Sequence, residues 1–70
     1  MIISKDNIKN KYVLAYCKAH GVKQGEEVKN TDYMFWIDKK HDDFRTLKGL
    51  PEHITLNEKE NKEFLVFIGL

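Results

Sequence analysis

The segment that begins at Asn30 constrains the fold of this chain more than any other, because both of its ends carry helix signals that do not depend on hydrophobicity. Asn30 and Thr31 are residue types that cap helix N-termini through a side-chain oxygen. Gly49 and Pro51 are typical of a helix C-terminus and of the residues just beyond it. The sequence therefore predicts a helix that begins at Asn30 or Thr31 and ends near Lys48.

The large apolar side chains of this helix divide into a core stripe and a remainder. At about 100° per residue, most of them fall within a sector about 100° wide that only Lys40 interrupts: Tyr33, Trp36, Ile37, Phe44 and Leu47. We expect this stripe to face the core, with the aliphatic stem of Lys40 lying along it.

Met34 and Phe35 remain outside the stripe. Phe35 lies on the side of the helix that carries Asp38 and Asp42, and Met34 lies on the other flank. An exposed aromatic residue beside carboxylates is typical of an anchor for another protein. We therefore predict a partner-binding site at four residues: Met34, Phe35, Asp38 and Asp42. The alternative is that the loop of residues 21–30, or the N-terminal strand, simply covers Phe35.

Another helix is predicted over residues 5–20, between Ser4 as the N-cap and Gly21 as the C-terminal stop. Its apolar side chains extend around more than half of its circumference: Ile8, Tyr12, Val13, Leu14, Ala15, Tyr16, Cys17 and Ala19. In so small a domain, such a helix must be covered by two different elements or by another chain.

The C-terminal tail admits two interpretations. Residues 54–55 are β-branched, residues 57–62 form a polar turn, and residues 64–68 are an unbroken apolar run, which together favour a β-hairpin. The alternative is that Asn57 caps a third helix over residues 58–67.

The strand chemistry of the Phe-Leu-Val-Phe-Ile run favours the hairpin, and residues 1–3 supply a third strand. The predicted fold is α+β, with two helices packed on a small antiparallel sheet in the order β-α-α-β-β. At 70 residues the chain forms a single compact domain, and its 41% hydrophobic and 33% charged content is that of a folded globular chain.

Charge and cysteine content narrow the function classes. A net charge of +1 does not favour phosphate-backbone binding, so nucleic acid is a secondary hypothesis. The single cysteine, Cys17, cannot close an intramolecular disulfide, and the N-terminus lacks the apolar run of a signal peptide, so we expect a reduced, cytoplasmic protein. No segment reaches the roughly 18 consecutive apolar residues of a membrane span, so no membrane association is expected.

No catalytic, metal or cofactor site is predicted, and no small-molecule substrate is indicated. A nucleophile requires an adjacent base and an oxyanion donor, and the spacing of Cys17, Ser4 and the threonines supplies no such set. His41 follows Asp38 by three residues and precedes two further aspartates, but Cys17 and the other histidines have no HxxxH, CxxC or HExxH partner, so a metal site is not expected. We therefore expect the protein not to be an enzyme.

The leading hypothesis is a small non-enzymatic module that binds another protein, or itself, through the flank of residues 34–42 or the wide apolar face of the residue 5–20 helix. The brevity of the chain and its Lys, Asn and Ile usage are typical of phage and mobile-element reading frames, which suggests a regulator or inhibitor that binds a host protein. The alternative is a small winged-helix-like nucleic-acid-binding regulator, with residues 31–48 as the recognition helix.

Overall fold

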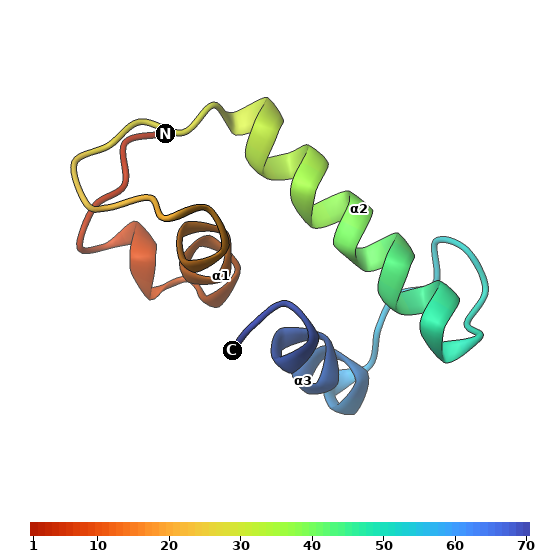
Figure 1. The fold of residues 1–70 in the computed structure, drawn as a ribbon. Helices are drawn as coiled ribbons and strands as arrows, with labels where there is room; N and C mark the ends of the chain where they lie inside the picture. The colour runs from red at the N-terminus through yellow and green to blue at the C-terminus, as the bar shows by residue number, and fades with distance from the viewer.

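A computed structural model describes residues 1–70 of the chain. It contains a short 3-10 helix and three α-helices: η1 (Asn7–Lys9), α1 (Lys11–His20), α2 (Asn30–Lys48) and α3 (Glu58–Phe67) (Figure 1). The only β-type pairing is an isolated antiparallel bridge between Ile2 and Glu27. The protein is therefore a helical domain, and the predicted α+β fold with an antiparallel sheet is wrong. None of its helices combines the length and the apolar content needed to cross a membrane.

The tail is a helix because its first turn is capped and its apolar residues suit a helical stripe. The Asn57 side chain accepts a hydrogen bond from the Glu60 N–H at 2.8 Å, and the Glu60 carboxylate accepts one from the Asn57 N–H at 3.0 Å. This capping box satisfies two N–H groups that a helix start would otherwise leave without partners. Phe64 and Ile68 are buried, whereas Val66 between them is 70% exposed. A strand would place all three on one face, so the predicted hairpin is wrong and the helical alternative is the one observed.

The N-terminal residues lie against the loop between α1 and α2 instead of against a sheet. The Ile3 N–H donates to the Glu26 carbonyl at 2.9 Å, and the Gly25 N–H donates to the Ile3 carbonyl at 2.8 Å. Ile3 and Val28 are buried next to α1 by this pairing. The strand predicted for residues 1–3 is thus reduced to one bridge, because the loop supplies its backbone partners and the helical tail does not.

The predicted helix over residues 5–20 is interrupted at Asn10. This residue has an extended backbone, with ψ of 123°, and its side-chain oxygen accepts hydrogen bonds from the N–H groups of Tyr12 and Val13. Asn10 therefore ends η1 and caps α1, since its side chain competes with the backbone for hydrogen bonds. The predicted C-terminal end is confirmed, because Gly21 follows α1 in the left-handed region with φ of 67°.

The bounds predicted for α2 are confirmed at Asn30 and Lys48, and Gly49 closes the helix in the left-handed region with φ of 69°. A glycine accepts this conformation without the steric cost that a β-carbon would add. The predicted capping by Asn30 or Thr31 is wrong, because Lys29 occupies the N-cap position and no side chain caps the helix.

The predicted core stripe of α2 is confirmed in its middle and wrong at its end. Ile37 and Phe44 are buried, and Tyr33 and Trp36 are partly buried. Leu47 is 70% exposed. Leu47 lies in the last turn of α2, where its neighbour Lys48 faces α3 and pairs with Glu63.

Two separate hydrophobic clusters bury α1. The first lies between α1, the N-terminal residues and the α1–α2 loop: Ile3, Val13, Tyr16, Cys17 and Val28. The second lies between α1, α2 and α3: Ala15, Phe44, Phe64 and Ile68. Trp36 of α2 packs against both clusters. Most of the wide apolar face of α1 is thus covered by two different parts of the same chain, which is one of the two arrangements predicted for it, whereas Leu14 is only partly buried and Ala19 is exposed.

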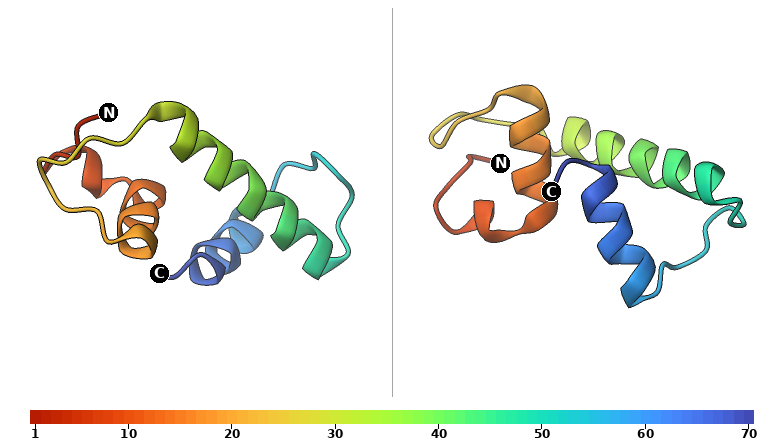
Figure 2. Two further views of the ribbon diagram at one scale, coloured as in Figure 1. Left: turned by 45° about the horizontal axis from the view of Figure 1, so that its top comes forward. Right: turned by 60° about the horizontal axis from the view of Figure 1, so that its bottom comes forward.

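The longest helix, α2, runs along one side of both α1 and α3, as the two views in Figure 2 show. The Tyr12 hydroxyl of α1 donates a hydrogen bond to the Asn61 side-chain oxygen of α3. The Lys48 ammonium of α2 lies 2.7 Å from the Glu63 carboxylate of α3. These contacts hold the three helices in one arrangement and leave the outward side of α2 without a covering element.

Candidate functional site

The outward side of α2 carries the most exposed aromatic side chain of the protein. Phe35 is 72% exposed and Met34 is 53% exposed. Phe35 and the buried Phe44 lie about 180° apart around the helix axis, at about 100° per residue. The loop of residues 21–30 packs toward α1 and leaves Phe35 open, so the covering that would have explained this residue is not observed.

Two carboxylates accompany Phe35 on the outward side of α2. Asp38 and Asp42 are one helical turn apart, and both are exposed. Asp38 has no ion-pair partner, whereas the Asp42 carboxylate lies 3.1 Å from the Arg45 guanidinium. Arg45 is held in turn by a hydrogen bond from its Nε to the Ile54 carbonyl at 3.2 Å. The apolar anchor is therefore bordered by one free and one partly neutralised carboxylate.

The four residues predicted to bind a partner are all exposed on α2, and we call them the Phe35 surface: Met34, Phe35, Asp38 and Asp42. Phe35, Asp38 and Asp42 lie on the outward side, and Met34 lies on its flank. They are brought together because three- and four-residue spacings along one helix place side chains next to one another. This combination can insert an aromatic ring into an apolar pocket whose edge is basic.

His41 is engaged in the fold and not presented as a ligand. Its Nδ1 lies 3.1 Å from the Ile37 carbonyl oxygen, and its ring stacks on Phe64 with centroids 4.1 Å apart. Burial lowers the pKa of His41 below its ordinary value, and the neighbouring Arg45 lowers it further. No group of three or more His, Cys, Asp or Glu side chains is arranged to hold a metal ion.

Cys17 packs as a small apolar residue in the first core cluster. Burial raises the pKa of its thiol, and the nearby Glu26 carboxylate raises it further. A reactive cysteine needs a lowered pKa and access to solvent, and Cys17 has neither. No buried polar side-chain atom in the protein lacks a hydrogen-bond partner, so none is left over to mark a site in the interior.

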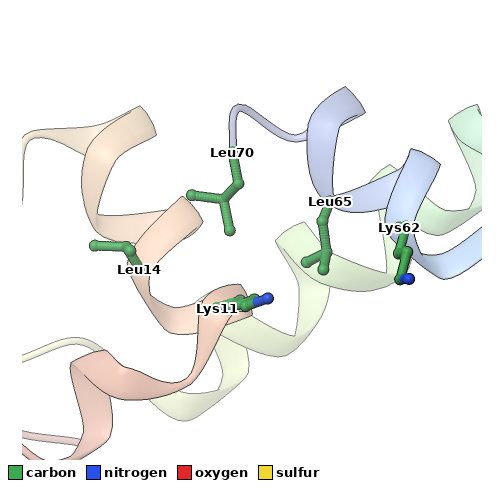
Figure 3. Close-up of a pocket in the computed structure, with 5 residues that line it drawn as sticks. All are labelled: Lys11, Leu14, Lys62, Leu65 and Leu70. Atoms are coloured by element: carbon green, nitrogen blue, oxygen red, sulfur yellow. The ribbon is translucent and has the colours of Figure 1, made fainter.

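A second surface lies between α1 and α3, on the side away from α2 (Figure 3). Leucines and lysines line a groove of about 470 Å³, which we call the leucine groove: Lys11, Leu14, Lys62, Leu65 and Leu70. The lysine side chains lie toward one end of the groove and Leu70 lies at the other (Figure 3).

The leucine groove was not predicted, because its second wall is a helix where the sequence favoured a strand. The signal that could have identified it is the pairing of a lysine with a leucine three residues later. This pairing occurs at Lys11 and Leu14 and again at Lys62 and Leu65, and on a helix such residues are neighbours.

The fold and these surfaces define a small three-helix domain with one uncovered aromatic anchor and one apolar groove. Comparison of the chain with protein-family models, with curated proteins and with solved structures found no match. The two surfaces are therefore the basis on which a function can be assigned.

Proposed function

We propose that the protein is a small non-enzymatic module that binds another protein through the Phe35 surface. One observation carries this proposal: Phe35 is 72% exposed in the second turn of α2, on its outward side. A buried aromatic side chain covers about 150–250 Å², so a partner that encloses this ring gains a large apolar contact. In the free protein most of the ring is left in contact with water.

The carboxylates beside Phe35 define the chemistry of the partner. Asp38 has no ion pair within the chain, and Asp42 forms an ion pair with Arg45. A complementary partner has an apolar pocket edged by lysine or arginine, since opposite charges steer the encounter and orient the complex. Because the anchor stands on a helix, the expected mode is a helix lying in a groove.

In this proposal the protein acts in a reducing, cytoplasmic compartment, as a phage or mobile-element regulator or inhibitor of a host protein. Its one cysteine is free and buried, which suits such a compartment. The winged-helix alternative has less support, because α3 stands where the wing would be. The outward side of α2 would also present Asp38 and Asp42 to phosphates, which repel carboxylates.

Capture of partners by matched variants tests the proposal. Phe35→Asp places a charge at the anchor, and Leu47→Asp is the control, because Leu47 is 70% exposed on the same helix but lies outside the Phe35 surface. Proteins captured from a lysate of the cell that expresses the chain are quantified by mass spectrometry. We expect a partner that the wild type and Leu47→Asp retain, and that Phe35→Asp loses by about tenfold or more. Capture that is insensitive to Phe35→Asp overturns the proposal.

A further inference from the structure

The leucine groove and the Phe35 surface are complementary. The groove offers an apolar floor edged by lysines, and the Phe35 surface offers an apolar ring edged by aspartates. We propose that the Phe35 surface of one copy docks in the leucine groove of a second copy, so that the protein associates head to tail. This inference rests on the proposed function and names the chain itself as a partner.

The lysines of the groove are available to such a partner. Lys11 is exposed and has no ion pair within the chain. The Lys62 ammonium lies 4.0 Å from the Glu58 carboxylate, and both side chains are largely exposed. An exposed pair of this kind contributes little to stability and yields readily to a better partner.

Charges around the two surfaces extend the complementarity. Lys18 donates a hydrogen bond to the Gly69 carbonyl at 3.4 Å, beside the Leu70 end of the groove, and Lys59 is exposed on α3. The outward side of α2 carries four aspartates: Asp32, Asp38, Asp42 and Asp43. Two basic residues lie among them, Lys39 and Arg45, and Arg45 is paired with Asp42. The outward side of α2 is thus net negative, although the whole chain carries a net charge of +1.

The groove also has a suitable size. Its volume of about 470 Å³ falls within the range of about 300–1,000 Å³ that is usual for binding pockets, so it can accept an aromatic ring. None of its lining residues belongs to α2. The groove opens between α1 and α3 on the side away from α2 (Figure 3), whereas Phe35 points away from the core on the outward side of α2, so the two surfaces face opposite ways. With this geometry, one copy does not exchange both contacts with the same neighbour. The contact is heterologous, which generates open chains or a closed ring.

Sedimentation of the wild type and of matched variants tests this contact. We expect the average mass of the wild type to rise with concentration through the micromolar to millimolar range, and less steeply in high salt. Phe35→Asp and the double variant Lys11→Glu/Lys62→Glu should each raise the dissociation constant by about tenfold or more, and Leu47→Asp should not. All of these positions are exposed, so an unchanged far-ultraviolet circular dichroism spectrum verifies the fold of each variant.

A mixing experiment distinguishes head-to-tail docking from other contacts. Phe35→Asp retains an intact groove, and Lys11→Glu/Lys62→Glu retains an intact Phe35 surface. Two such variants, each monomeric alone, should form a one-to-one heterodimer that grows no further. Failure of the mixture to associate, although the wild type does, overturns the proposal.

Two other results also overturn it. One is a wild type that stays monomeric at the highest concentration. If it still captures a different protein in a Phe35-dependent way, the proposed function stands and only the self-association is overturned. If that capture is also absent, the proposed function and the self-association are both overturned. The other is a fluorescent oligonucleotide that the wild type binds and Lys11→Glu/Lys62→Glu does not, while self-association is the same in both. That result would assign the groove to nucleic acid.

Discussion

Phe44 and Phe64 occupy the centre of the second core cluster, where they are 2% and 0% exposed and meet edge to face with ring centroids 5.5 Å apart. Phe64→Ala should lower the free energy of unfolding by about 3–5 kcal/mol, because it removes buried surface and leaves a cavity. That loss is a large part of the roughly 5–15 kcal/mol that stabilises a small domain. Unfolding in urea measures it.

The matched control is Phe35→Ala, the same chemical change at a residue that is 72% exposed. It should alter the free energy of unfolding by no more than about 0.5 kcal/mol, as is usual for surface substitutions. Equal losses at Phe35 and Phe64 would contradict the orientation of α2 or of α3.

His41 gives the stability a defined dependence on pH. Burial and then Arg45 hold its folded-state pKa below the ordinary value of 6.5, an effect that exceeds the opposing ones of the Ile37 carbonyl, Asp38 and Asp42. As the pH falls through about 6.5, the unfolded chain takes up the proton first, so the free energy of unfolding decreases. We expect full stability above this pH and a decline below it.

The variant His41→Gln should flatten this decline, which thermal unfolding at a series of pH values between about 7 and 5 can measure. The control is His53→Asn, because His53 is exposed in a left-handed turn with φ of 59°, a conformation that asparagine tolerates. A loss of stability at low pH that persists in His41→Gln and disappears in His53→Asn would contradict the assignment to His41 and point to His53 instead.

Helix α3 depends on its capping box. Asn57→Ala removes the side-chain oxygen that accepts a hydrogen bond from the Glu60 N–H. It should lower the free energy of unfolding by about 1 kcal/mol. Asn57→Asp keeps an acceptor at the same position and should retain most of the stability. Melting followed by circular dichroism compares the two. An unchanged melting temperature in Asn57→Ala would contradict the cap, and with it the helical form of the tail.

The helix boundaries divide into those that the sequence predicts and those that it does not. The left-handed glycines Gly21 and Gly49 end α1 and α2 as predicted, because a glycine C-cap is a local property of the chain. The break at Asn10 was not predicted, since asparagine can either continue a helix or cap a new one. The start of α2 is right in position but has no side-chain cap.

In the whole molecule, α1 is shared by both core clusters, and Trp36 packs against both of them. The two clusters should therefore unfold together. We expect the unfolding transitions followed by tryptophan fluorescence and by circular dichroism at 222 nm to coincide, as two-state behaviour requires.

The variant Ile3→Ala tests this coupling from the first cluster, where Ile3 is 1% exposed and far from α3 in the sequence. It should lower the midpoints of both unfolding transitions by the same amount and reduce the free energy of unfolding by about 2–5 kcal/mol. A fluorescence transition that precedes the loss of helical signal would mean that the clusters unfold independently.

Most of the Phe35 surface was predictable from the sequence, because all of its residues lie within nine consecutive positions of one helix. Helical spacing alone separates Phe35 from Ile37 and Phe44, and the structure places them on opposite sides of α2. The leucine groove was not predictable in the same way, since Leu14 and Leu65 belong to different elements and meet only through tertiary packing.

The sequence by itself therefore determined the ends of α1 and α2 that glycine signals and the outward orientation of Phe35, because caps and helical periodicity act over a few residues. Tertiary structure decided the state of residues 58–68. Their apolar run is compatible with strand or helix, and its pattern does not choose between them. In the fold no strand is available to pair with this run, whereas Ala15 and Phe44 form a cluster with Phe64 and Ile68. A helix places Phe64 and Ile68 on one side and turns Val66 to the other, whereas a strand would place all three on the same side.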